Sequence, residues 1–254
     1  MQDAPTNSPR PLLILKTGDT YESLRQPRGD FEHWVADGLN CAELPVLVLD
    51  PRQGDVLPAP GDIAGVVVTG SHSMVSHREP WSERTAAWLA GVVSEDRVPV
   101  LGICYGHQLL AHALGGEAGD HPVAMEIGTV QVQLTDAATQ DPLFGAMPAH
   151  FDAHVVHRQS ALALPPGAVR LASNDFEPNQ AFRIGERAWG VQFHPEFDEQ
   201  AMRGYVDTLA ESLQSPDELR AAVRPTPQAA SLLERFARLA AQAESREPAT
   251  AAAC

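Results

Sequence analysis

The chain has 254 residues, and 33 Asp and Glu against 18 Lys and Arg give it a formal net charge of −15. This length can bury a full hydrophobic core without disulfides or a structural metal, and the acidic balance argues against a nucleic-acid-binding surface, which is usually basic. No run of about 18 apolar residues predicts a membrane span, and the N-terminus lacks the apolar segment of a signal peptide. The three cysteines form no CxxC pair, so we expect a protein of the reducing cytoplasm without a disulfide framework.

The first half of the chain alternates short apolar runs with helix-like segments. The apolar runs predict strands at residues 11–18, 44–50, 64–71 and 98–104. Helical spacing of apolar residues predicts helices at 31–39, 80–96 and 105–114. Because the strands are wholly apolar, we expect an α/β fold of the flavodoxin-like kind, with a mostly parallel central sheet flanked by helices.

The second half of the chain has a different pattern. Residues 128–135 alternate apolar and polar side chains, as a half-buried antiparallel strand does, and strand-like segments continue to residue 196. Two amphipathic segments, 198–213 and 226–244, predict helices. We therefore expect a small antiparallel addition to the sheet and one domain over residues 1–213, with a flexible start at 1–10. A helical C-terminal extension over 214–254 would follow and end in a disordered tail.

The last predicted helix carries an apolar stripe at helical spacing, formed by Leu232, Leu233, Phe236 and Leu239. Such a stripe usually faces the protein core. We expect this helix to pack on the domain, and the alternative is a surface for a partner.

The segment Gly102-Ile103-Cys104-Tyr105-Gly106 stands where a predicted strand becomes a helix. This is the G-x-nucleophile-x-G layout of a nucleophile elbow, in which small flanking residues let strand and helix approach closely. The helix N-terminus favours a thiolate on Cys104, and the Tyr105 N–H points to where an oxyanion forms. Gln108 lies one helical turn further and faces a substrate above the thiol. The alternative is a buried cysteine at a tight glycine turn.

A second segment, WGVQFHPEF at residues 189–197, supplies the groups that a nucleophilic cysteine needs. Residues i and i+2 of an extended segment point to the same side, and Pro195 keeps this segment extended. Glu196 can therefore hold one nitrogen of the His194 ring while the other nitrogen faces Cys104. Taken alone, these residues could be an ordinary strand end, but the two segments together favour a Cys-His-Glu catalytic triad.

The two segments resemble the signature blocks of class I glutamine amidotransferases, and the similarity covers roughly residues 12–213. The chain looks most like stand-alone members related to the amidotransferase domain of GMP synthase. The resemblance implies that Cys104 is the nucleophile, His194 the acid–base group and Glu196 its orienter. It also implies that Gln108 contacts bound glutamine, and that the oxyanion hole involves Gly70, Ser71 and Tyr105. The implied reaction cleaves the γ-amide of glutamine through a cysteinyl thioester and requires no cofactor or metal.

One position departs from the family pattern. Many relatives have His-x-Asp in a segment near the substrate, whereas this chain has His157-Arg158-Gln159. The resemblance places His157 beside the substrate, but Gln159 in place of the acid leaves the identity of the γ-glutamyl compound open.

Three functions are compatible with this sequence. The protein could be a glutaminase subunit that supplies ammonia to a separate synthetase. It could be a γ-glutamyl peptide or amide hydrolase that acts without a synthetase. The third alternative is a non-catalytic regulatory or binding protein on the same fold.

The remaining histidines allow other interpretations. His150, His154 and His157 have the spacing of metal ligands on one helix face, but the segment lacks a helical pattern. We expect a loop with exposed or hydrogen-bonded histidines there and no metal. His72 and His77 follow the third predicted strand, where a substrate loop and a solvated loop are both possible.

Overall fold

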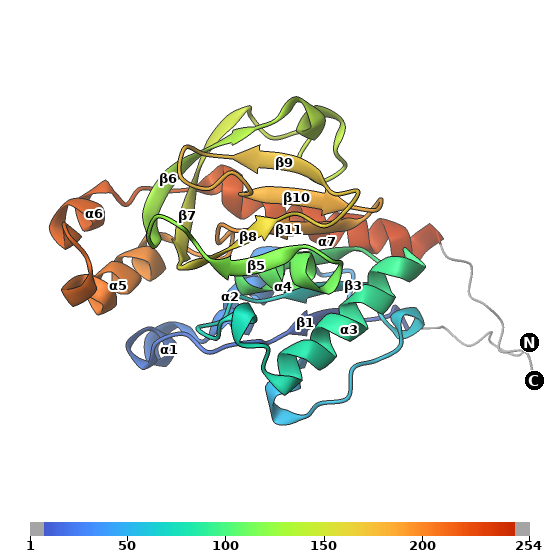
Figure 1. Cartoon of the computed structure of the whole chain (residues 1–254). Coiled ribbons are helices and arrows are strands. Elements are labelled where there is room, and N and C mark those ends of the chain that lie inside the picture. Colours follow the sequence, from blue (N-terminus) through green and yellow to red (C-terminus); the bar gives the residue numbers. More distant parts are fainter. Residues whose placement is uncertain (1–7, 247–254) are drawn as a thin grey trace, which may run out of the picture.

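A nine-stranded sheet runs through the molecule, and the computed structural model describes residues 8–246 around it (Figure 1). The strands follow the order β2-β1-β3-β4-β11-β10-β9-β6-β7. Their bounds are β1 Leu12–Leu15, β2 Val46–Leu49, β3 Gly65–Val68, β4 Val100–Ile103, β6 Glu126–Leu134, β7 His150–His157, β9 Val169–Ser173, β10 Ala181–Ile184 and β11 Ala188–Val191. A two-stranded sheet pairs β5 Glu117–Asp120 with β8 Gln159–Ala163. The helices are α1 Glu22–Arg28, α2 Phe31–Leu39, α3 Pro80–Glu95, α4 Tyr105–Ala113, α5 Glu199–Leu209, α6 Pro216–Ala222 and α7 Pro227–Arg246.

The sheet has two halves of different kinds. Strands β2, β1, β3, β4 and β11 form a parallel half, and β10, β9, β6 and β7 continue it as an antiparallel half. The predicted α/β fold with helices flanking a central sheet is therefore confirmed. The sheet is mixed, however, and its antiparallel part is broader than the small addition expected from the sequence.

Helices cover both faces of the parallel half, as Figure 1 shows for α3 and α7. Successive residues of a strand point to opposite faces. Leu12 and Ile14 accordingly belong to the core under α2 and α7, whereas Leu13 and Leu15 belong to the core under α3 and α4. The outermost strand, β2, is less well covered, since Val46 remains 41% exposed at the sheet edge.

Helix α7 is part of the main core. Leu232, Leu233 and Phe236 are fully buried, and Leu239 packs against the same core. The helix lies on α2 and β7, and it approaches α2 so closely that a Cβ on Gly38 would stand 2.4 Å from Leu233 Cδ1. The apolar stripe thus packs on the domain, as predicted. The short helix α6 was not predicted, because Pro216 at its start resembles a linker proline.

The segment with three regularly spaced histidines is a strand, so the loop expected there is wrong. Strand β7 pairs with β6 along its whole length. Phe151, Ala153 and Val155 alternate as buried residues on one face, which is a strand pattern that the polar histidines between them obscure. His154 and His157, three residues apart, therefore point to opposite sides of the sheet.

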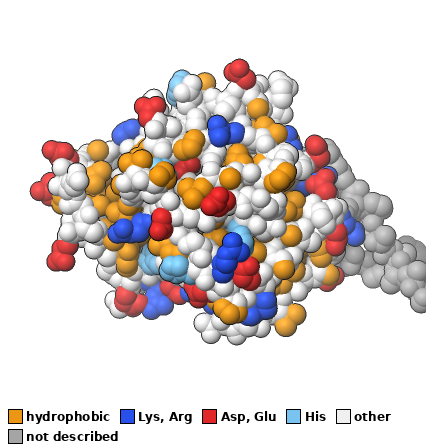
Figure 2. Space-filling model, viewed as in Figure 1, with side chains coloured by type: hydrophobic (Ala, Val, Ile, Leu, Met, Phe, Trp, Pro, Cys, Tyr) orange, Lys and Arg blue, Asp and Glu red, His pale blue; other side chains and the backbone are white. Residues whose placement is uncertain are grey.

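Residues 1–7 and 247–254 lie outside the described residues, and so do most of the expected flexible start, the expected tail and Cys254. Between residues 8 and 246, no helix is long and apolar enough to cross a membrane. On the face seen in Figure 2, basic side chains stand apart from one another among acidic and apolar ones.

Candidate functional site

Cys104 sits in the sharp turn between β4 and α4. Its backbone has φ 49° and ψ −97°, a left-handed conformation that side chains other than glycine rarely adopt. Two glycines make this turn possible. A Cβ on Gly102 would stand 2.3 Å from the Gly106 carbonyl oxygen, and a Cβ on Gly106 would stand 2.5 Å from the Val68 carbonyl oxygen. The expected nucleophile elbow is therefore present, and it holds the thiol at the carboxyl end of a parallel strand.

His194 follows β11, the neighbour of β4, and is fixed from three sides. Its Nδ1 lies 2.8 Å from Glu196 Oε1, and its backbone N–H donates to the His154 carbonyl oxygen at 2.8 Å. The Phe197 ring stacks on the imidazole with centroids 4.2 Å apart. The Nε2 atom is buried and has no hydrogen-bond partner among residues 8–246. One ring nitrogen is thus held by a carboxylate, and the other is left for chemistry.

The charge state of His194 follows from its neighbours. Burial alone would lower the pKa of the imidazole, but the Glu196 carboxylate and the Cys104 sulfur outweigh burial and raise that pKa to about 10. The protonated ring is therefore the favoured form at neutral pH, and it is ready to donate a proton. The Glu196 side chain is fully buried, so water does not screen its charge.

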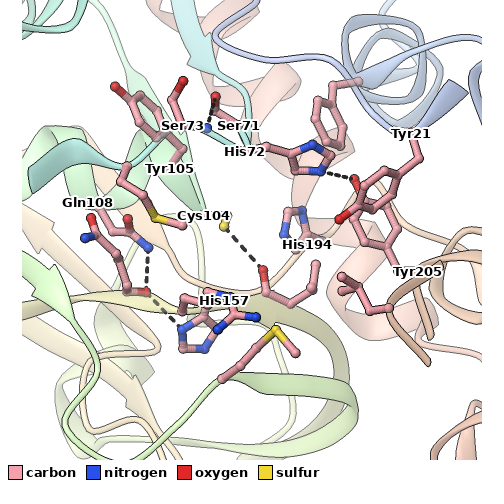
Figure 3. A pocket seen from close by; sticks show the side chains of 17 residues that line it. Tyr21, Ser71, His72, Ser73, Cys104, Tyr105, Gln108, His157, His194 and Tyr205 are labelled. Carbon is pink, nitrogen blue, oxygen red and sulfur yellow. Dashed lines mark hydrogen bonds between the residues drawn. The ribbon is translucent and has the colours of Figure 1, made fainter. Parts of the chain in front are cut away.

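Cys104 and His194 open into one cavity of about 240 Å³ (Figure 3). Eight of the residues singled out in the sequence line it: Ser71, His72, Cys104, Tyr105, Gln108, His157, Gln159 and His194. Gly70 lies beneath them, and a Cβ there would stand 3.1 Å from His194 Cε1 and 3.9 Å from Cys104 Cβ. A side chain at this position would therefore press on the His194 ring. Glu196 stays behind His194, outside the cavity lining.

Two backbone N–H groups near the thiol have no partner. Neither Gly70 nor Tyr105 donates a main-chain hydrogen bond to any residue in the described range, and Tyr105 stands at the first position of α4, where no intrahelical partner exists. The Tyr105 hydroxyl is engaged elsewhere, 2.6 Å from Ser82 Oγ. These free N–H groups are suited to an oxyanion.

A buried polar network supports the opposite wall of the cavity. Gln108 Nε2 donates to the Gln159 carbonyl oxygen at 2.7 Å, which is also 3.0 Å from His157 Nδ1 (Figure 3). His157 Nε2 lies 2.9 Å from Glu126 Oε2. The Gln159 side chain itself donates to Ser76 and Asp120. Gln159 therefore positions the wall with its backbone, while its side chain ties the β5–β8 sheet to the loop after β3.

Two tyrosines that the sequence did not single out also line the cavity. Tyr21 and Tyr205 lie with His72 on the side of the cavity away from Gln108 (Figure 3). For His72, the substrate-loop alternative is therefore favoured over a solvated loop. His72 Nε2 and the Tyr205 hydroxyl share a hydrogen bond of 3.2 Å. Burial and the nearby His194 charge lower the pKa of His72, so a neutral ring faces the protonated one. His77 is exposed in a 3-10 turn and does not line the cavity.

Arg158 is another lining residue that the sequence analysis did not single out. The sequence could have pointed to Arg158, because it stands between His157 and Gln159 in the segment that departs from the family pattern. The sequence offered no such signal for Tyr21 and Tyr205, because the loop and the helix that carry them contain no motif. Within residues 8–246, no cluster of His, Cys, Asp or Glu could hold a metal ion.

Comparisons with known proteins identify the family of this chain. Residues 30–206 match the family model for class I glutamine amidotransferases. The chain is 35% identical over 173 residues to the glutamine-hydrolyzing GMP synthase of Aeropyrum pernix, covering 66% of this chain and 31% of that protein. A GMP synthase of Thermomicrobium roseum is 37% identical over 132 residues, covering 52% of this chain and 23% of that protein. The chain thus spans about a third or less of these curated relatives.

Solved structures show the same fold. A glutamine amidotransferase from Methylobacillus flagellatus superposes with a TM-score of 0.67 at 27% identity, covering 94% of both chains. One from Thermotoga maritima has a TM-score of 0.69 at 20% identity, covering 92% of this chain and 99% of that chain. The matched family model spans both the elbow and the His-Pro-Glu segment. The chain therefore belongs to the class I glutamine amidotransferase family.

Proposed function

We propose that this protein hydrolyses the γ-amide of glutamine through a thioester on Cys104, releasing glutamate and ammonia. One observation carries the proposal. The unpartnered Nε2 of His194 and the Cys104 sulfur line the same cavity, and Glu196 holds the far side of the ring. A nucleophile, a base and an orienting carboxylate are the minimum set for acyl transfer by a cysteine.

The mechanism uses groups already in place. The Cys104 sulfur attacks the side-chain carbonyl carbon of glutamine, and the N–H groups of Gly70 and Tyr105 stabilise the oxyanion. His194 gives its proton to the amide nitrogen, the C–N bond breaks, and ammonia leaves. Water then attacks the thioester while His194 takes its proton, and the C–S bond breaks to give glutamate.

The use of the ammonia defines the wider role. A glutaminase subunit would pass it to a separate synthetase, as the two activities in the name of the glutamine-hydrolyzing GMP synthases suggest. Hydrolysis of larger γ-glutamyl amides, without a synthetase, is the second candidate. Arg158 in the cavity lining favours this candidate, because ammonia carries no group that an arginine would bind. The scattered cysteines are consistent with either reaction in the cytoplasm.

A diazoketone analogue of glutamine tests the proposal, because it alkylates a cysteine that attacks the γ-carbonyl position. Mass spectrometry of the intact protein should show one label on the wild type and none on Cys104→Ala. Cys41→Ala is the matched control, since Cys41 is the other cysteine of the described residues and lies outside the cavity. It should label at the wild-type rate. Full labelling of Cys104→Ala would disprove the assignment of the nucleophile.

A further inference from the structure

A second hollow adjoins the catalytic cavity. It lies where β6 meets the segment around α6, and its walls include the apolar residues Ile127, Phe176, Leu213 and Leu219. Met125 and Arg158 line both this groove and the catalytic cavity. The two hollows therefore adjoin each other at these two residues, next to where a ligand longer than glutamine would extend out of the catalytic cavity.

Arg158 carries an uncommitted positive charge at this junction. Its side chain is exposed and makes no hydrogen bond or ion pair with any residue of the described part. Its backbone is fixed, because His157 and Gln159 on either side are buried and its carbonyl oxygen accepts from the His121 N–H at 2.8 Å. Most other arginines of this acidic chain have an acidic partner, such as Arg28 with Asp198.

The charge of Arg158 also reaches across the cavity. Burial raises the pKa of Tyr21, and the positive charge of Arg158 opposes that rise. Tyr21 lines the catalytic cavity, so the positive charge of Arg158 contributes to the electrostatic potential inside that cavity. Glu218 lies in the groove as well, but it forms no ion pair with Arg158. The guanidinium is thus free to bind an anion.

We propose that the groove binds the leaving group of a γ-glutamyl peptide, and that Arg158 binds the α-carboxylate of the leaving amino acid. This inference rests on the thioester mechanism above and names its substrate class. A guanidinium binds a carboxylate through two parallel hydrogen bonds, and the apolar walls accommodate an apolar side chain. In the reaction the amide C–N bond breaks as the C–S bond forms. His194 protonates the nitrogen of the departing amino acid, and water later releases glutamate.

A matched pair of substrates tests this assignment. γ-Glutamyl-phenylalanine and γ-glutamyl-phenylalanine amide differ only in the charge that Arg158 would bind. We expect wild-type kcat/KM to be at least about tenfold higher for the peptide with the free carboxylate, a modest yield for a charged hydrogen bond. Arg158→Ala should reduce this ratio of kcat/KM values to about one. Arg158→Lys should give an intermediate ratio, because an ammonium group keeps the charge but cannot make the two parallel hydrogen bonds of a guanidinium.

Arg84→Ala is the matched control, because Arg84 is also exposed, has no side-chain partner among the described residues and lies outside both hollows. Its ratio should equal that of the wild type. A wild-type ratio near one, or an unchanged ratio in Arg158→Ala, would overturn the inference. Hydrolysis of glutamine but of neither peptide would overturn it too, while the proposed function stands. If Cys104 is not labelled by the diazoketone and no substrate is cleaved, both fail.

Discussion

The two halves of the sheet contribute different things to one cavity. The parallel half presents Gly70, Cys104 and His194 just beyond the carboxyl ends of three adjacent strands, β3, β4 and β11. The antiparallel half and the β5–β8 sheet contribute His157, with Glu126 behind it, and the Gln159 backbone. In the proposed mechanism the first set holds the groups that make and break bonds, whereas the second set forms a wall of the cavity.

This difference has a physical basis. Parallel strands deliver their carboxyl ends to one edge, so short turns there are held by two packed layers and can store backbone strain, as at Cys104. The antiparallel wall is held by a network of buried hydrogen bonds, in which each polar group depends on its partners. The proposed function therefore places reaction chemistry and substrate selectivity in different parts of the molecule, and it predicts that substitutions in the two halves have different consequences.

The largest effect is expected from Gly106→Ala in the parallel half. The new Cβ would stand 2.5 Å from the Val68 carbonyl oxygen and 2.8 Å from Val68 Cβ, so β3 would have to move. We expect a loss of about 4 kcal/mol or more in the free energy of unfolding, measured by denaturant titration. Gly91→Ala in α3 is the control, because a Cβ there meets nothing within 4 Å. It should not destabilise the protein. Equal stability of the two variants would contradict the close packing of the elbow.

The next largest effect is expected from Glu196→Gln, which preserves shape but removes the charge behind His194. We expect kcat for glutamine to fall about 100-fold, or about 2.7 kcal/mol in activation free energy. The pKa of His194, followed by NMR of the ring nitrogens, should fall, because the carboxylate that raises it is gone. Asp198→Asn is the control. Asp198 is a nearby carboxylate that caps α5, and Asn is an equally good cap. It should keep kcat within about twofold of the wild-type value.

The same pair predicts how stability depends on pH. The pKa of His194 is raised in the folded state, so its stabilising contribution is fully present below the unfolded pKa of about 6.5. This contribution is lost as the pH rises through the folded value of about 10. In Glu196→Gln the folded pKa of His194 is lower, so the stabilising contribution is smaller and its loss is complete at lower pH. The free energies of unfolding of the two proteins should therefore differ more at pH 6 than at pH 10. An identical pH dependence would show that Glu196 does not control the charge of His194.

The halves also differ in how well the sequence predicts them. The elbow and His-Pro-Glu motifs gave Cys104, His194 and Glu196 because local sequence alone sets their geometry. Strand β7 was missed, because its partner β6 is separated from it by an intervening loop and its histidines conceal the alternation. Tyr21 and Tyr205 reach the cavity only through tertiary packing, which no local pattern encodes. The fold class was predictable, the motifs named the candidate triad, and the family resemblance named Gln108 and His157 of the wall, whereas the two tyrosines of the cavity could not be found in this way.

Glu126→Gln tests the wall by a smaller change. Glu126 accepts hydrogen bonds from Asn174 and Gln180 and holds His157, so an amide there would leave at least one buried donor unpaired. We expect stability to fall by about 2 kcal/mol. We also expect KM for glutamine to rise about tenfold with kcat changed less than threefold, since the reacting groups are untouched. A fall in kcat without a rise in KM would show that the antiparallel half takes part in the chemistry.

The smallest loss of stability is expected from breaking a contact between the segment that joins α6 to α7 and strand β7. Arg224, between α6 and α7, donates to both carboxylate oxygens of Asp152 on β7, at 2.7 and 2.6 Å. Both side chains are partly exposed, so water screens the pair. Arg224→Ala should reduce the free energy of unfolding by under about 1 kcal/mol and leave KM for glutamine unchanged. The loss should shrink in high salt. Asp152→Ala should give a similar loss, and the double variant should lose less than the sum, because the two residues share one interaction. A rise in KM would instead mean that the ion pair on β7 influences the substrate wall that the end of the same strand helps to form.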